Sequence, residues 1–117
     1  MPPKILIIED SESWGELFSM DLAADFEIEL ATTQESARQL VEAHKGELAA
    51  VVMDACVPGD NPNTQYLTEW VRSQFAGPII AASSSKKWAQ NLTEHGASHF
   101  CEKTELAAKV REVLLVA

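Results

Sequence analysis

The chain has 117 residues, of which 46% are hydrophobic and 23% are charged, so it is long enough to bury one core and too apolar to be disordered. Its formal net charge of -9 argues against direct binding to nucleic acid or to an anionic membrane, because both attract basic surfaces. The sequence has neither a transmembrane run nor a signal-peptide pattern, which predicts a cytoplasmic protein whose cysteines, Cys56 and Cys101, stay reduced.

Strand-like and helix-like patterns alternate from one end of the chain to the other. Short apolar or alternating runs predict strands, and apolar residues spaced by three and four predict helices. In chain order, the predicted elements are a strand at 4–9, a helix from about Ser13 with Trp14, Leu17, Phe18 and Leu22 on one face, a strand at 26–31, a helix from 32 to about 46, a strand at 48–54, a helix from 63 or 64 to before Gly77, a strand at 79–83, a helix from 83–85 to Gly96, a strand at 98–103 and a last helix from 104.

Polar residues that can cap a helix precede each predicted helix. They are Asp10 or Ser11, a capping box of Thr32 and Glu35, Asn63 or Thr64, one of the serines 83–85, and Thr104.

The composition of the strands predicts their order in the sheet. The runs at 4–9, 48–54 and 79–83 are almost wholly apolar, as in central parallel strands that are covered on both faces. The runs at 26–31 and 98–103 carry polar residues and suit the edges. With right-handed crossovers, the chain is predicted to be an α/β, doubly wound (βα)5 protein of the flavodoxin-like type, whose five-stranded parallel sheet has the order 2-1-3-4-5 and helices on both faces.

Three carboxylates follow the first and third predicted strands, Glu9 and Asp10 after one and Asp54 after the other. The carboxyl ends of these neighbouring strands form the ligand-binding edge of a doubly wound sheet. Two unit charges about 4 Å apart repel by roughly 4 kcal/mol at an effective dielectric constant of 20, so a cation is expected among them. Because all the ligands are oxygens, Mg2+ is the predicted ion.

Two further polar side chains, Ser83 and Lys103, end the fourth and fifth strands and are expected at the same edge. A lysine and a divalent cation can neutralise a phosphoryl group, and a hydroxyl can donate to one of its oxygens. A carboxylate can accept that group as an aspartyl phosphate. Asp54, alone at the end of a central strand, is the predicted nucleophile.

Several motifs resemble the receiver domains of two-component response regulators, and the resemblance covers essentially the whole chain, 1–117, as a single domain. "ILIIED" resembles the family's strand that ends in two acids, and "VVMDACVP" its phosphoacceptor strand. "PIIAASS" resembles the strand that ends in a switch hydroxyl, and "GASHFCEK" the segment with an aromatic switch residue and a lysine. Each motif is weak alone, but their order and their places at strand ends are specific.

The resemblance implies a role for each matching residue. Asp54 would be the phosphoacceptor, with Ser83 and Lys103 completing the catalytic set. Glu9, Asp10, Asp54 and the backbone carbonyl of Cys56 would hold Mg2+, with Asp10 the stronger candidate of the acid pair. Ser83 and Phe100 would be switch residues that remodel the surface of the fourth helix, fifth strand and fifth helix.

The resemblance also implies partners. A histidine kinase or a phosphotransfer protein would donate the phosphoryl group, and an effector protein or an output domain would read the switched surface. Homodimerisation through that surface stays open.

This chain departs from the family pattern at several positions. Thr104 stands where receivers commonly have proline after the lysine, and Ser84 stands where a small apolar residue is usual. The loop at 55–63 is about two residues longer than typical. Cys56 and Ser85 occupy positions to which dephosphorylation rates in the family are sensitive, so the lifetime of the phosphorylated state stays open.

Two other functions remain as alternatives. The first is a phosphorylation-independent interaction module with the same fold and an acidic surface. The second is an aspartyl-phosphate hydrolase, which usually requires a second acid where this chain has Cys56. Taken singly, Glu9, Asp10, Ser83 and Lys103 also have an ordinary structural explanation, as a helix cap or a solvated charge. Asp54 does not, because a polar side chain directly after a buried run needs water or a partner. The tryptophans Trp14, Trp70 and Trp88 are expected in the core or at an interface.

Overall fold

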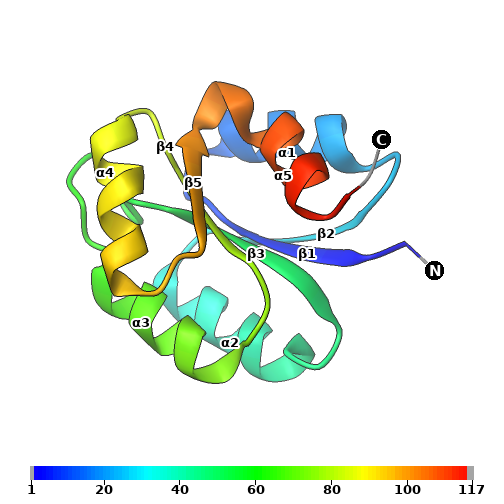
Figure 1. The fold of residues 1–117 in the computed structure, drawn as a ribbon, viewed down its shortest axis with the longest axis horizontal. Helices are drawn as coiled ribbons and strands as arrows, with labels where there is room; N and C mark the ends of the chain where they lie inside the picture. Colours follow the sequence, from blue (N-terminus) through cyan, green and yellow to red (C-terminus); the bar gives the residue numbers. More distant parts are fainter. Residues whose placement is uncertain (1, 116–117) are drawn as a thin grey trace.

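The computed structural model describes residues 2–115, which form one five-stranded parallel sheet between two layers of helices (Figure 1). The strand order is β2-β1-β3-β4-β5, and every neighbouring pair is parallel. The predicted fold class and strand order are therefore confirmed.

Strands and helices alternate along the chain as the sequence predicts. They are β1 (Lys4–Ile8), α1 (Glu12–Leu22), β2 (Glu27–Ala31), α2 (Gln34–His44), β3 (Leu48–Asp54), α3 (Gln65–Gln74), β4 (Ile79–Ser83), α4 (Lys86–Asn91), β5 (His99–Glu102) and α5 (Leu106–Val113), with short 3-10 turns η1 (Leu92–His95) and η2 (Lys103–Glu105).

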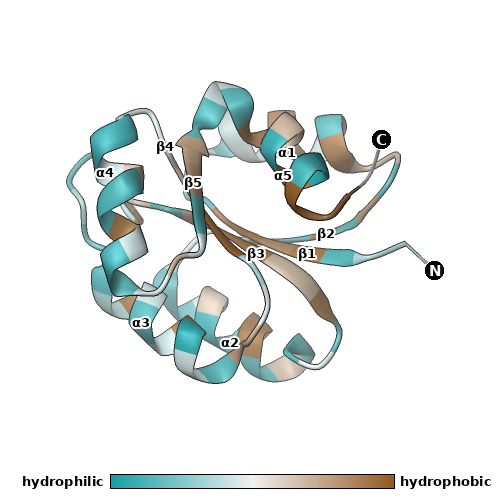
Figure 2. Cartoon of the chain, viewed as in Figure 1, coloured by the Kyte–Doolittle hydropathy of each residue, from teal (hydrophilic) through white to brown (hydrophobic). Residues whose placement is uncertain are grey.

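The sheet separates two hydrophobic cores, because successive side chains of a strand point to opposite faces. Leu6 and Ile8 of β1 pack with α2, α3 and α4 on one face, whereas Ile5 and Ile7 pack with α1 and α5 on the other. All four of these β1 side chains are fully buried. Figure 2 shows the same division, with apolar strands at the centre and polar residues on the outer faces of the helices. No helix within residues 2–115 is long and apolar enough to cross a membrane.

Helix α1 is rotated relative to the face that its large apolar residues predict. Its buried residues are Gly15, Phe18 and Leu22, and Leu17 is 45% exposed. The cause is Gly15, where an added Cβ would lie 3.0 Å from Leu30 Cδ2 of β2. Because glycine allows this close approach, the helix turns Leu17 outward, and the prediction of an inward Leu17 is wrong.

Two predicted caps are also wrong. Helix α2 is capped by Thr33, whose Oγ1 accepts the Ser36 N–H at 2.9 Å, rather than by a box of Thr32 and Glu35. Thr104 lies inside η2 and caps no helix. A reciprocal box of Glu102 and Glu105 opens that turn instead. The cap at Ser11 is confirmed, since its Oγ accepts the Trp14 N–H.

The loop from β3 to α3 is held in place by side chains from both sides. Gln34 Nε2 at the start of α2 donates to the carbonyls of Val57 (2.7 Å) and Asn63 (3.0 Å). Asn63 Oδ1 accepts the Val57 N–H at 2.7 Å, and Thr64 Oγ1 donates to the Asp54 carbonyl at 2.7 Å. These bonds hold the long loop at 55–63 beside the carboxyl end of β3.

Candidate functional site

The predicted site residues lie around one pocket of about 350 Å³ at the carboxyl ends of the strands. Six of the seven line it, and they are Glu9, Asp10, Asp54, Cys56, Ser83 and Lys103. Phe100 does not line this pocket. It lies on β5, partly buried, and lines a separate groove between α4, β5 and α5.

Lys103 lies between two buried carboxylates. Its Nζ is 2.6 Å from Glu9 Oε1 and 3.2 Å from Asp54 Oδ2, and its side chain is 9% exposed. The contact with Asp54 has the alignment of a hydrogen bond, whereas that with Glu9 Oε1 is an ion pair that lacks it. One ammonium group is therefore shared by two carboxylates that are largely removed from water.

Burial and charge shift the pKa values of this cluster. Glu9 is 1% exposed, and burial followed by the adjoining Asp54 raises the pKa of its carboxyl to about 7. Burial alone would lower the pKa of Lys103, but its contacts with Glu9 and Asp54 outweigh burial and raise it. Lys103 is therefore charged at neutral pH, whereas Glu9 takes up a proton more readily than a solvated carboxyl does.

The Asp54 carboxylate at the end of β3 is held by a backbone N–H of the following loop and by Lys103. The side chain of Asp54 is buried, and Oδ1 accepts the Cys56 N–H at 3.2 Å while Oδ2 faces Lys103. The Cys56 thiol is buried, and burial raises its pKa to about 11, so it keeps its proton at neutral pH. The arrangement fixes one carboxylate with a positive group on one side and a backbone donor on the other.

Asp10 lies at the outer side of the acid cluster. Its Oδ2 accepts the Gly59 N–H at 2.9 Å, which joins the end of β1 to the long loop after β3. Gly59 has a φ of 86°, a left-handed conformation that glycine adopts without strain. Through this contact the long loop binds Asp10 and closes one side of the pocket. Asp60, the next residue of the loop, adds a fourth carboxylate to the pocket lining.

The acid cluster fits a hard divalent cation. One carboxylate oxygen from each of Glu9, Asp10 and Asp54 lies within 4.8 Å of the other two. Glu9 Oε1 is buried, and among residues 2–115 it has an ion pair with Lys103 at 2.6 Å but no aligned hydrogen bond. Oxygen ligands of this kind, with room for water in an open pocket, are those that Mg2+ or Ca2+ prefers.

Ser83 lies at the end of β4 on the same pocket and is almost fully buried. Its Oγ accepts the N–H of Ser85 at 3.1 Å, so its own hydroxyl proton can be donated into the pocket. Ser85 in turn caps α4 through the N–H of Trp88.

Six residues that line the pocket were not predicted as site residues. Ser11, Gly59 and Ser84 contribute small groups, and the other three carry large or charged side chains. These three are Asp60, Trp14 and Trp88. The tryptophans lie at helical spacing, which suggests core residues, and Asp60 lies in a loop without a motif. The position of Asp60 follows from the turn that brings its loop back to Asp10. The position of Trp14 follows from Lys103, whose Nζ lies 5.4 Å from the centre of the Trp14 ring.

The raised pKa of Glu9 predicts a pH dependence of stability. Between about pH 4.5 and 7, folded Glu9 keeps a proton that unfolded Glu9 loses, so the free energy of unfolding falls as the pH rises. Without divalent cations, we expect Glu9→Gln to remove up to about 3 kcal/mol of this fall, measured by urea unfolding at several pH values. Glu16→Gln, at an exposed site of α1 without an ion pair among the described residues, is the control. An unchanged pH slope in Glu9→Gln would contradict the expectation.

Comparison with known proteins places the fold. No protein-family model matches the chain, and no curated protein sequence is significantly similar to it. A two-component response regulator from Clostridium difficile superposes with a TM-score of 0.82 at 20% identity, covering 97% of this chain and 96% of that one. The BeF3-activated receiver domain of RstA from Klebsiella pneumoniae gives 0.78 at 25% identity, with 95% and 97% covered.

A response regulator from Burkholderia pseudomallei, whose structure contains a phosphorylated aspartic acid, a calcium ion and citrate, gives a TM-score of 0.80 at 17% identity and covers 96% of this chain and 66% of that one. The chain therefore has the fold of response-regulator receiver domains, and the resemblance noted in the sequence is confirmed at the level of the fold.

Proposed function

We propose that this chain is a phosphoacceptor receiver domain in which Asp54 takes a phosphoryl group from a histidine kinase or a phosphotransfer protein, with Mg2+ bound at the acid cluster. The observation that carries the proposal is the position of the Lys103 ammonium group. Although Lys103 is distant in sequence, its Nζ lies 3.2 Å from Asp54 Oδ2 and 2.6 Å from Glu9 Oε1. Burying three ionisable groups together costs free energy, and such clusters are typical of functional sites. The pocket beside them, of about 350 Å³, is open to a ligand.

The proposed transfer uses groups that line the pocket. A carboxylate oxygen of Asp54 attacks phosphorus, the bond from phosphorus to the donor nitrogen breaks, and the donor imidazole leaves with the electron pair. Lys103 and the hydroxyl of Ser83 stabilise charge on the phosphoryl oxygens. Glu9, Asp10, Asp54 and the carbonyl of Cys56 would hold Mg2+, which supplies charge neutralisation when it is bound.

Phosphorylation is proposed to act as a switch through Ser83. In the unphosphorylated protein, Ser83 Oγ accepts the N–H of Ser85 next to α4. A phosphoryl group that takes the Ser83 hydroxyl would shift that turn, and Phe100 on β5 would adjust beside it. The readout is the surface of α4, β5 and α5, where a groove of about 540 Å³ already lies beside Phe100. An effector protein or an output domain would bind there, and a second copy of the chain is another candidate.

The two alternative functions account for less of the site. In an aspartyl-phosphate hydrolase, the residue two after the nucleophile is an acid that moves protons, whereas Cys56 is a buried, protonated thiol. A phosphorylation-independent binding module needs the fold but gives no reason for a buried lysine between Glu9 and Asp54. A signalling receiver rather than an enzyme with turnover is the function that these residues support.

Incubation with a small-molecule phosphodonor such as acetyl phosphate tests the proposal. In Mg2+, the intact mass should rise by one phosphoryl group, and EDTA should prevent the rise. Reduction with borohydride converts an acyl phosphate to an alcohol, so peptide mapping should then find homoserine at position 54. No gain in mass, with either this donor or a phosphorylated phosphotransfer protein, would refute the proposed function. A gain at another position would refute the choice of Asp54.

A further inference from the structure

The pocket that holds Asp54 is lined mostly by polar or charged residues, but two large apolar side chains also line it. These are Trp14 and Trp88. Trp14 stacks on Phe18 of α1, with 5.4 Å between ring centres, and contacts Lys103. Trp88, on the first turn of α4, is 37% exposed and belongs to neither hydrophobic core of buried side chains. The partly exposed indole of Trp88 therefore forms part of the wall of the pocket that holds Asp54, Ser83 and Lys103.

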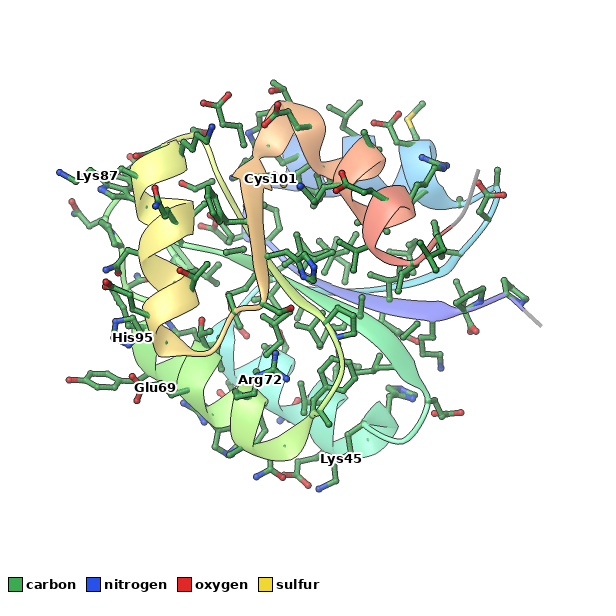
Figure 3. The ribbon with its side chains drawn as sticks, in the orientation of Figure 1. Lys45, Glu69, Arg72, Lys87, His95 and Cys101 are labelled. Carbon is green, nitrogen blue, oxygen red and sulfur yellow. The ribbon has the colours of Figure 1, made fainter. Side chains whose placement is uncertain are left out.

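Hydrogen bonds hold α4 in position at both ends. At its beginning, Ser83 Oγ accepts the Ser85 N–H and Ser85 Oγ accepts the Trp88 N–H, so the backbone of Trp88 is linked to the pocket hydroxyl through one residue. Beyond α4, His95 of η1 contacts Glu69 of α3, and Arg72 Nε donates to the Gly96 carbonyl at 2.9 Å. Figure 3 shows His95 beside Glu69 at one end of this helical segment and Lys87, the neighbour of Trp88, at the other.

Loss of an aspartyl phosphate requires water in the pocket. A water oxygen attacks phosphorus, the bond from phosphorus to the Asp54 oxygen breaks, Asp54 regains its carboxylate, and the proton of the water passes to bulk solvent. The attacking water must come from the open side of the pocket, because Asp54 is 4% exposed and is covered by β3 and its loop on the other side. Trp88 lines this pocket and is partly exposed, and a bulky apolar ring in the lining excludes water without offering a group that could activate it.

We propose that Trp88 shields the aspartyl phosphate from water and so sets the lifetime of the phosphorylated state. The inference rests on the proposed function and adds to it a residue that governs its regulation. Trp88 is preferred to Trp14 because Trp14 contacts Lys103, so changing it would also disturb the transfer step.

The lifetime is measured by intact mass after the phosphodonor is removed, with Mg2+ kept present. We expect Trp88→Ala to shorten the half-life of the phosphorylated protein by roughly threefold or more, and Trp88→Phe to shorten it less. Tyr66→Ala is the matched control, because Tyr66 is an aromatic residue on α3 that is 80% exposed and does not line the pocket. Its half-life should equal that of the wild type.

A second measurement follows the ring itself. Acrylamide quenching is compared between the wild type and Trp88→Phe, so that the difference reports on Trp88 while Trp14 stays beside Lys103, and beryllofluoride with Mg2+ imitates the phosphoryl group. We expect filling of the pocket to reduce quenching of Trp88 fluorescence by acrylamide. This measurement decides the inference if Trp88→Ala cannot be phosphorylated.

The outcomes separate the two proposals. If the wild type is phosphorylated at Asp54 but Trp88→Ala and Tyr66→Ala lose the group at the wild-type rate, the shielding inference is wrong and the proposed function stands. An unchanged quenching of Trp88 by acrylamide after the pocket is filled also overturns the inference. If the wild type is never phosphorylated, both proposals fall.

Discussion

Replacing Lys103 by methionine should lower the free energy of unfolding at neutral pH by about 3 kcal/mol, because it leaves two buried carboxylates without their shared cation. The side chains of Glu9 and Asp54 are 1% and 6% exposed, so water reaching them through the pocket would solvate them far less than bulk water does. Protonation of Glu9, whose pKa is already raised to about 7, relieves part of the repulsion. The loss should therefore be smaller at pH 5 than at pH 8, measured by urea unfolding in EDTA.

Two further variants separate this charge effect from a simple loss of packing. Lys109→Met removes a more exposed lysine that pairs with Glu112 on the surface of α5, and it should cost less than about 1 kcal/mol. The double variant Glu9→Gln/Lys103→Met removes one of the stranded charges and should recover most of the lost stability. Failure of Glu9→Gln to restore any stability to Lys103→Met would contradict the account of a shared cation.

The sheet was predictable because its pattern is simple. Runs such as Ile5–Ile8 are fully buried, and short apolar runs rich in β-branched residues are typical of central parallel strands that are covered on both faces. The polar residues of β2 and β5 place those strands at the edges. Short right-handed crossovers then leave the order 2-1-3-4-5, which the structure confirms.

Two predictions were wrong for different reasons. The cap of α2 could be either of two adjacent threonines, and the rotation of α1 is set by a close backbone contact that the apolar pattern does not show. Thr32 and Thr33 are adjacent and can both cap a helix, and pairing of Ile8 with Ala31 at the end of β2 makes Thr33 the cap. At α1, the rule that large apolar residues point inward ignores Gly15, although close contact with Leu30 is what sets the rotation of the helix.

Sequence reasoning predicted which strand-end residues would line one pocket, but not how they pair. Strand ends place Glu9, Asp10, Asp54, Ser83 and Lys103 at one edge of the sheet, and all five line the pocket. The sequence does not show that Lys103 contacts Glu9 more closely than it contacts Asp54, because that depends on the turn η2. It also does not show that Gly59 bonds to Asp10, because loop conformation has no periodic pattern from which to read it.

Replacing Asp54 by asparagine should abolish the gain of phosphoryl mass, since the amide of asparagine is a far weaker nucleophile than a carboxylate. The fold should survive, because asparagine has the same shape and its amide oxygen can still accept the Cys56 N–H. Asp54 contributes to the raised pKa of Glu9, so its removal should also lower that pKa toward the ordinary value. The pH dependence of unfolding then serves as an independent readout of the same substitution.

Asp60→Asn is the matched control for Asp54→Asn. Asp60 is an exposed carboxylate at the rim of the same pocket, and it has the same charge but no contact with Lys103 among the described residues. We expect this control to gain phosphoryl mass as the wild type does. If Asp54→Asn were phosphorylated and Asp60→Asn were not, the acceptor would be the loop residue. A loss in both variants would instead show that the acidic charge of the pocket, through the cation it binds, limits the transfer, because a single acceptor requires only one of the two carboxylates.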